Sequence, residues 1–158
     1  MTELSADAQA ACRRAQLIGG ALVSSIVVYV YVLRVVAAHH APFIGFAPSL
    51  DLRLLRVIFA LVAVVDLAML RVLTSSVLGT ARPAPTAGGG ASVAARLTTL
   101  SIVRLAICEA VAILGVVLFL LGGRWADFSG FAVASLAAFA FNFPRRSQWE
   151  DWVRQLPR

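Results

Sequence analysis

The fold class of this chain is decided by residues 105–121, which read LAICEAVAILGVVLFLL. Every position in this stretch is apolar or small except Glu109, and the length approaches what a helix needs to cross a bilayer. A charged side chain in hydrocarbon costs about 2.5–3.5 kcal/mol even on the mildest insertion scale. Glu109 therefore indicates a buried polar site. Asp66 interrupts an earlier apolar run in the same way.

The composition of the 158 residues is that of an integral membrane protein, because 60% are hydrophobic and the mean hydropathy is +0.86. The net charge of +6 comes from arginine alone, since the chain contains no lysine. Arginine beside apolar spans usually orients a membrane protein in its bilayer. We therefore expect the lipid bilayer as a partner, and no nucleic acid.

Four apolar runs predict an all-α membrane protein, a bundle of four transmembrane helices in one domain over residues 1–158. The runs cover residues 15–36, 54–73, 100–121 and 128–143. The tight turn Gly122-Gly123-Arg124 joins the last two, so we expect the bundle to consist of two helical hairpins. Residues 80–95 contain two prolines and three consecutive glycines, which predict a flexible cytoplasmic loop.

The arginines on the two sides of the predicted spans set the orientation. One side collects Arg13, Arg14, Arg71, Arg82, Arg96, Arg145, Arg146, Arg154 and Arg158. The other side collects Arg34, Arg53, Arg56 and Arg124. The excess of positive charge on cytoplasmic segments places both termini inside, in the inner (cytoplasmic) membrane of a bacterium.

The segment after the last span predicts a short amphipathic helix, residues 147–156, on the cytoplasmic face. Ser147 and Glu150 have the spacing of a capping box, in which each satisfies the first turn of a helix. Tryptophan prefers the headgroup layer, so we expect Trp149 and Trp152 at the membrane interface. Docking to a partner protein is the alternative role for this helix.

Four charged residues within the predicted spans form a matched pattern. Asp66 lies five residues before Arg71, and Arg104 lies five residues before Glu109. Because the two runs are antiparallel, the two carboxylates are expected in one layer and the two arginines in another, about 7.5 Å away. Residues five apart do not face one another on a helix, so pairing across helices is at least as well supported. The cross-helix pairs would join Asp66 to Arg104 or Glu109 to Arg71.

Three interpretations of these charges stay open. In the first, they form interhelical ion pairs that fix the register of the helices. In the second, at least one carboxylate is protonated at neutral pH, because burial disfavours its charged form, and it binds and releases a proton or a sodium ion. In the third, both acids lie at the periphery and reach water.

Small residues spaced four apart predict places where helices approach closely. These residues are Gly20 and Ser24, Ala106 and Ala110, and Gly130, Ala134 and Ala138.

Residues 109–117, EAVAILGVV, resemble the carboxylate-bearing helix of rotary ATPase subunit c, the proteolipid, which typically reads Glu-Ala-x-Ala-Ile-x-Gly-Leu-Val. The resemblance covers the third span only. It implies that Glu109 is an ion-carrying carboxylate, on a helix that follows a cytoplasmic loop. The chain as a whole looks like a bacterial four-span membrane protein with a third helix similar to that of subunit c.

We expect a small non-enzymatic subunit of an oligomeric or multi-subunit membrane complex, joined to copies of itself or to other membrane subunits. In the transport version, Glu109 binds a proton or cation and Asp66 is the second carboxylate. The alternative is a structural accessory subunit, whose intramembrane charges are only interhelical ion pairs. We expect no cofactor and no metal, since the adjacent His39 and His40 have no acidic residue near them in the sequence.

Overall fold

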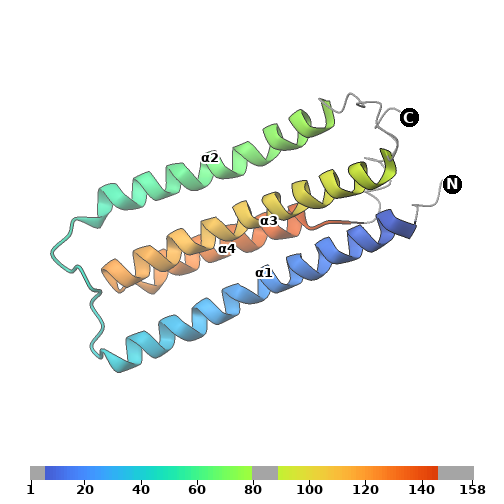
Figure 1. Cartoon of the computed structure of the whole chain (residues 1–158). Helices are drawn as coiled ribbons and strands as arrows, with labels where there is room; N and C mark the ends of the chain where they lie inside the picture. Colours follow the sequence, from blue (N-terminus) through green and yellow to red (C-terminus); the bar gives the residue numbers. More distant parts are fainter. Residues whose placement is uncertain (1–5, 80–88, 146–158) are drawn as a thin grey trace.

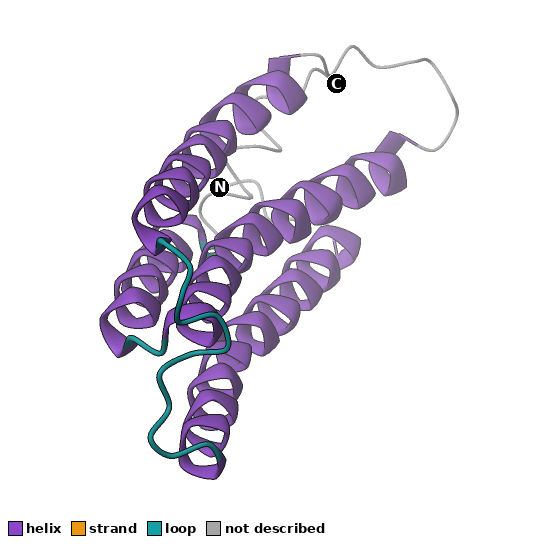
Figure 2. Ribbon diagram, turned by 90° about the vertical axis from the view of Figure 1, so that its left-hand side faces the viewer, coloured by secondary structure: helices purple, strands orange, loops and turns teal. Residues whose placement is uncertain are grey.

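The computed structural model describes residues 6–79 and 89–145, which form four helices in an up-down-up-down order (Figure 1). The helices are α1 (Ala6–His39), α2 (Leu52–Gly79), α3 (Gly89–Gly122) and α4 (Trp125–Asn142). The described ranges contain helices and loops and no strand, as Figure 2 shows. The predicted all-α class is therefore confirmed.

The first three predicted apolar runs lie within α1, α2 and α3, and each of these helices extends beyond its run; the fourth run, 128–143, continues one residue past the end of α4 at Asn142. The largest difference concerns the predicted flexible loop, residues 80–95, because α3 begins at Gly89. The prediction is wrong for residues 89–95, where Ala94 and Ala95 favour helix and a helix already formed downstream is easily extended. Residues 80–88 and the predicted tail helix, with Trp149 and Trp152, lie outside the described residues.

Two helices are long and apolar enough to cross a bilayer, judged by length and composition. In the described ranges these are Gln9–His39 within α1 and Leu97–Gly122 within α3. The helix α2 carries Arg53, Arg56, Asp66 and Arg71, and α4 has only 18 residues. Within the described residues, these two helices do not meet the same test of length and composition.

The helix α3 is the centre of the molecule. It packs against all three other helices, whereas α1 and α2 lie on opposite sides of it (Figure 1). The expected second pair, α3 with α4, does form a hairpin. The expected first pair does not, because α1 and α2 are not packed along one another. A helix that is apolar on all sides can bury more than one face, and the apolar residues of α3 are the most evenly distributed around the helix axis.

The buried faces of α1 and α3 follow one rule of spacing. In α3, burial recurs at alternating steps of four and three residues at positions 97, 101, 104, 108, 111, 115 and 118. In α1, buried or half-buried positions recur in the same way at 12, 15, 19, 22, 26, 29 and 33. Steps of four and three keep side chains on one face of a helix. This face of α1 packs against α3.

The end of the bundle that carries the two short connections, residues 40–51 and 123–124, is here named the loop end. The opposite end, where α1 begins and α4 ends, is named the terminal end (Figure 1). At the loop end, the Phe46 and Ala47 amides donate to the carbonyl oxygens of Leu120 and Leu121, at 2.8 and 3.1 Å. These carbonyls would otherwise lack partners at the end of α3. The first loop is thus fixed to α3.

Two glycines at the loop end adopt backbone conformations with positive φ. Gly123 ends α3 with φ of +68°, and its amide donates to the Phe119 carbonyl oxygen at 2.7 Å, which is the usual way for a glycine to terminate a helix. Gly45 has φ of +90°, and a side chain there would collide with the Leu121 carbonyl oxygen. Phe43 stacks on Phe119 beside them, with ring centroids 5.4 Å apart.

The close helix contacts involve other glycines than those expected. A Cβ at Gly115 would lie 2.7 Å from Phe131 Cβ and 3.1 Å from the Phe128 carbonyl oxygen. Gly20 and Gly130 have open space around them instead. The prediction from small residues is therefore wrong for these two glycines, because spacing alone does not say which face of a helix meets a neighbour.

Candidate functional site

Glu109 lies in the apolar part of α3, on the side of that helix that faces α1. Its neighbours in sequence and along the helix, Leu105, Cys108 and Ala112, are completely buried. Glu109 itself is half-buried. The carboxylate is therefore placed between two helices, and not in the centre of the bundle.

Two hydroxyl groups of α1 donate to a single oxygen of this carboxylate. The Ser25 Oγ atom lies 2.6 Å and the Tyr29 Oη atom 2.7 Å from Glu109 Oε1. Ser25 and Tyr29 are four residues apart, so they project from the same face of α1. Hydrogen bonds to an ionised acceptor are stronger than those between neutral groups. This polar cluster of Ser25, Tyr29 and Glu109 joins α1 to α3 within apolar surroundings.

The Ser25 hydroxyl has a second acceptor within reach. Its Oγ atom also lies 2.7 Å from the Leu22 carbonyl oxygen, one turn earlier in α1. A hydroxyl carries one proton and accepts through its lone pairs, so Ser25 donates to only one of these oxygens at a time. With Ser25 turned toward Leu22, its oxygen can accept a hydrogen bond from a protonated Glu109. The same geometry therefore suits both protonation states of the carboxyl group.

Arg104 lies one and a half turns from Glu109 and contacts a different helix. It is 9% exposed, and its Nη2 atom donates to Asn142 Oδ1 of α4 at 2.6 Å. The Asn142 amide in turn donates to the Ala138 carbonyl oxygen at 2.8 Å. Arg104 is thus held toward α4, while Glu109 is held toward α1. The five-residue spacing explains why the two side chains of α3 diverge.

Asp66 and Arg71 complete the four residues predicted from sequence. Asp66 is half-buried and Arg71 exposed, both on α2. At about 1.5 Å per residue, Asp66 and Glu109 each lie about 20 Å from the loop end. They are at comparable depth, but on opposite sides of the central helix, because α2 and α1 flank α3 (Figure 1).

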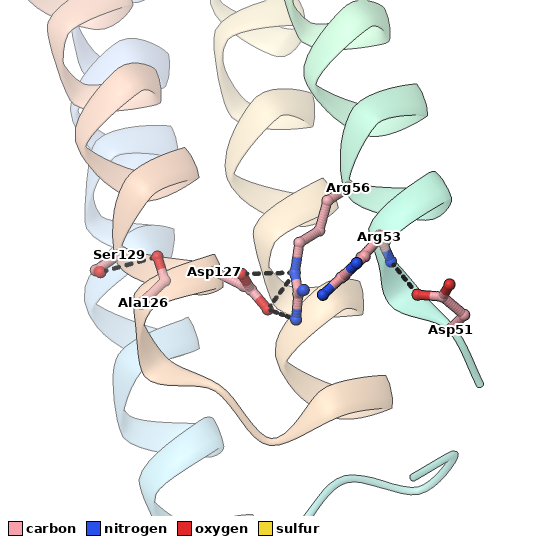
Figure 3. A network of polar contacts seen from close by, with 6 residues as sticks. All are labelled: Asp51, Arg53, Arg56, Ala126, Asp127 and Ser129. Atoms are coloured by element: carbon pink, nitrogen blue, oxygen red, sulfur yellow. Dashed lines mark hydrogen bonds and ion pairs between the residues drawn. The ribbon is translucent and has the colours of Figure 1, made fainter. Parts of the chain in front are cut away.

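The expected ion pairs among these four residues do not form. In residues 6–79 and 89–145 the one ion pair joins Arg56 of α2 to Asp127 of α4 (Figure 3), with Nη2 and Oδ2 2.9 Å apart. Arg56 Nε also donates to both carboxylate oxygens at 3.0 Å. The prediction of cross-helix pairs among Asp66, Arg71, Arg104 and Glu109 is therefore wrong: Glu109 accepts from the hydroxyls of Ser25 and Tyr29, and Arg104 donates to the side-chain amide of Asn142.

The sequence reasoning missed Ser25, Tyr29, Asn142 and the pair of Arg56 with Asp127. A signal for the first two exists, because they are hydroxyl side chains four apart inside an apolar run. No comparable local signal points to Asn142, which is the last residue of α4.

Comparisons with models of known protein families, with curated proteins and with solved structures find no match to this chain.

Proposed function

We propose that the chain is a four-span protein of the bacterial cytoplasmic membrane. Large apolar side chains are exposed along α1, α2 and α4, where a water-soluble protein would gain by burying them. On α1 they include Leu17, Val27, Val28, Tyr31 and Val32, and on α2 they include Leu54, Val57, Leu61, Val64 and Val65. Such surfaces suit a lipid environment, in which apolar exposure carries no cost.

The other two helices, α2 and α4, also fit a membrane. The 18 residues of α4 reach about 27 Å, close to the hydrocarbon thickness of about 30 Å, and α2 is longer. The charge of Arg56 is paired with Asp127 near the loop end. Asp66 and Arg71 lie toward the terminal end, and the long arginine side chain can extend to the headgroup layer.

The proposed orientation places the terminal end in the cytoplasm and the loop end outside. It follows the excess of arginine on the segments at the terminal end.

Within this frame, we propose that the polar cluster of Ser25, Tyr29 and Glu109 binds and releases a proton. The observation that supports it is the pair of hydroxyl contacts on Glu109 Oε1, together with the alternative acceptor of Ser25. When Glu109 is ionised, both hydroxyls donate to it. When it is protonated, it donates to Ser25, which turns to the Leu22 carbonyl oxygen. The proton is taken up and lost without moving either helix.

A proton fits this cluster better than a sodium ion does. A metal cation needs several oxygen ligands with their lone pairs directed at it. Here one carboxylate meets two hydroxyls that already donate toward it. Turning both hydroxyls away would offer at most four oxygens, the two of the carboxylate and the two hydroxyls, fewer than a hard cation prefers.

A single proton site is useful when other subunits or copies supply access to it, so we place this chain in a homo-oligomer or a larger membrane complex. The resemblance of residues 109–117 to the proteolipid helix favours the same role for Glu109. The second candidate is a structural accessory subunit, in which the polar cluster only locks α1 against α3. The direct contact between these helices favours it to the same extent.

Labelling with a hydrophobic carbodiimide separates the two candidates, because this reagent attacks protonated carboxyl groups buried in apolar surroundings. We expect Glu109 to be labelled at low pH and protected at high pH in the purified chain, with the site identified by mass spectrometry. Glu109→Gln should abolish this labelling and keep the fold, since the amide oxygen accepts the same hydroxyl contacts. Asp66→Asn is the matched control and should leave the labelling of Glu109 unchanged.

Labelling of Glu109 that is absent at every pH would contradict the proton site. The structural role would then be the better account of the polar cluster.

A further inference from the structure

One side of α3, opposite α4, is left uncovered by the helices of residues 6–79 and 89–145. Ala106 lies two residues after Arg104, and Ile113 two residues before Gly115; both Arg104 and Gly115 meet α4. Residues two apart point to roughly opposite sides of a helix. Exposed or half-buried residues recur along this side of α3 at alternating steps of four and three. They are Thr99, Val103, Ala106, Ala110, Ile113 and Val117.

This side of α3 is continuous with the adjoining sides of α1 and α2, and we name the whole surface the three-helix face. In Figure 1 it is turned toward the viewer, with α2 and α1 on either side of α3 and α4 behind. Its described part on α3 is apolar except for Thr99.

Glu109 borders the three-helix face on the side of α1. Ala106 and Ile113, about one turn before and after Glu109, are exposed on this face. On α1, Ser25 follows Gln16 by nine residues, which is two and a half turns. Gln16 donates to a backbone carbonyl oxygen just beyond α4, so Ser25 points away from α4. The polar cluster therefore lies on the three-helix side of the contact between α1 and α3.

Asp66 borders the same face on the side of α2. Ala63 and Leu70, seven residues apart, form a buried line along this helix. Leu67 and Arg71 lie to one side of the line, where they line an open groove between α2 and α4. Because each residue turns a helix by about 100°, Asp66 lies on the other side of the line, away from α4.

The charges predicted within the spans are thus sorted by side. Arg71 and Arg104 lie toward α4, where Arg104 donates to Asn142 at 2.6 Å. Asp66 and Glu109 border the three-helix face, both about 20 Å from the loop end. In the proposed orientation this depth lies within the hydrocarbon layer, which is about 30 Å thick. Carboxylates at this depth attract positive charge strongly, because the surroundings screen it little.

We propose that the three-helix face binds an amphipathic organic cation, a positive centre surrounded by apolar or aromatic groups, which enters from the lipid. The positive centre lies beside Glu109 and Tyr29, since a carboxylate and an aromatic ring both attract such a cation. Asp66 adds a second negative charge from α2. The apolar groups lie on Ala106 and Ala110.

The chemistry of the polar cluster suits this ligand class. A metal ion needs several directed oxygen ligands, whereas an organic cation is held by charge and apolar contact. The inference rests on the proposed membrane location and deepens the proposed proton site, because proton and organic cation use the same carboxylate of Glu109.

A ligand of limited size fits the three-helix face better than a further transmembrane helix. Small side chains occupy the uncovered side of α3 at the depth of the carboxylates, at Ala106 and Ala110, and the larger Val103 and Ile113 lie at either end of them. Helices approach closely where small residues recur along the whole contact. Here the small residues cover only the middle of the face, so the rest of it suits lipid chains.

Equilibrium dialysis of the full chain in detergent, at high pH, tests the proposal. The probes are tetraphenylphosphonium and tetraphenylborate, which have the same shape and opposite charge, each corrected for binding to empty micelles. We expect the chain to bind tetraphenylphosphonium only. Glu109→Gln should weaken this binding about tenfold, the equivalent of one charge-assisted contact, and Asp66→Asn should weaken it less. Asp51→Asn, at an exposed acidic residue of the first loop, is the matched control and should have no effect.

A second pair of variants tests the apolar part of the site. Ala106→Leu places a larger side chain on the three-helix face and should weaken the binding of tetraphenylphosphonium. Ala140→Leu makes the same change at an exposed position of α4 and should not. If Ala106→Leu changes the mass of the solubilised complex and leaves cation binding intact, a second copy of the chain occupies the face and the proposal is overturned.

Equal binding of both probes, or tetraphenylphosphonium binding that survives Glu109→Gln unchanged, would also overturn the proposal. So would binding that appears only when Arg154→Gln and Arg158→Gln are introduced, since the C-terminal arginines would then be the natural occupants. The proton site is tested apart from this. Labelling of Glu109 at low pH without tetraphenylphosphonium binding would leave the proton site and reject the cation site, whereas Glu109-dependent binding without labelling at any pH would support the cation site alone.

Discussion

The Glu109 carboxylate depends on two residues of another helix for its hydrogen bonds. Ser25 and Tyr29 compensate part of the cost of placing a carboxyl group among apolar side chains, because both hydroxyls donate to its Oε1 atom. Each hydrogen bond also fixes the register of α1 relative to α3. A substitution that removes one hydroxyl should therefore weaken both the polar cluster and the packing of α1.

The substitution Tyr29→Phe tests the hydrogen bond between Tyr29 and Glu109. We expect it to lower the free energy of unfolding in detergent by about 1.5–3 kcal/mol, the range for a hydrogen bond to a charged group. In a Glu109→Ala background the same change should cost much less, because the partner is already gone. Tyr31→Phe is the control, since Tyr31 is 69% exposed on the same helix. Equal effects of Tyr29→Phe in both backgrounds would show that the two residues are not coupled.

The elements of the bundle are held together mainly through α3. Its contact with α4 is the closest, because Gly115 lets the backbone of α4 approach at Phe128 and Phe131. Its contact with α1 uses another face of α3, where Leu105 lies beside Gly19 and Glu109 accepts hydrogen bonds from Ser25 and Tyr29. The helix α2 is fixed to α4 near the loop end by Arg56 and Asp127. Toward the terminal end, an open groove lined by residues such as Leu67, Leu70 and Phe141 separates the two helices.

Gly115→Ala should destabilise the hairpin of α3 and α4. The added Cβ would lie 2.7 Å from Phe131 Cβ, so α4 must move away, and overpacking of this kind costs about 1–3 kcal/mol. Gly130→Ala, on the open side of α4, should be neutral or stabilise by up to about 1 kcal/mol through its better helix propensity. Unfolding in denaturing detergent measures both. If the Gly115→Ala chain is as stable as the native one, α3 and α4 are not closely packed at Gly115.

At the scale of the whole molecule, the two ends differ in construction. The loop end is closed by hydrogen bonds from the first loop to α3 and by aromatic contacts, such as that of Phe119 with Trp125 at 4.5 Å between centroids. Among the described residues, the terminal end carries Arg13, Arg14, Arg71 and Arg145. This asymmetry matches the proposed orientation, with a capped external face and a basic cytoplasmic face.

Cysteine labelling in intact cells tests the orientation. A cysteine at Ser49, an exposed residue of the first loop, should react with a membrane-impermeant reagent added outside. A cysteine at Gly88, between α2 and α3, should react only after the cells are opened. The native chain is the control, because Cys12 and Cys108 are both buried and should react little. The reverse pattern would invert the proposed topology.

Several features of the molecule follow from the sequence by itself. Apolar runs of sufficient length predict helices, because a helix satisfies its own backbone hydrogen bonds and needs no distant partner. The four helices of residues 6–79 and 89–145, their order and the turn at Gly122-Gly123 were predicted in this way. The position of Glu109 inside an apolar helix was equally visible, since it depends on neighbours in the chain alone.

The tertiary structure decided which side chains meet. The depth of Asp66 and Glu109 follows from the rise of a helix, but whether they share a site depends on how each helix is rotated and which neighbour it contacts. Here α1, and not α2, lies against Glu109, so its partners are Ser25 and Tyr29. The rotation of each helix is set by the packing of distant residues, such as Gly115 on Phe131, and no local pattern encodes that choice.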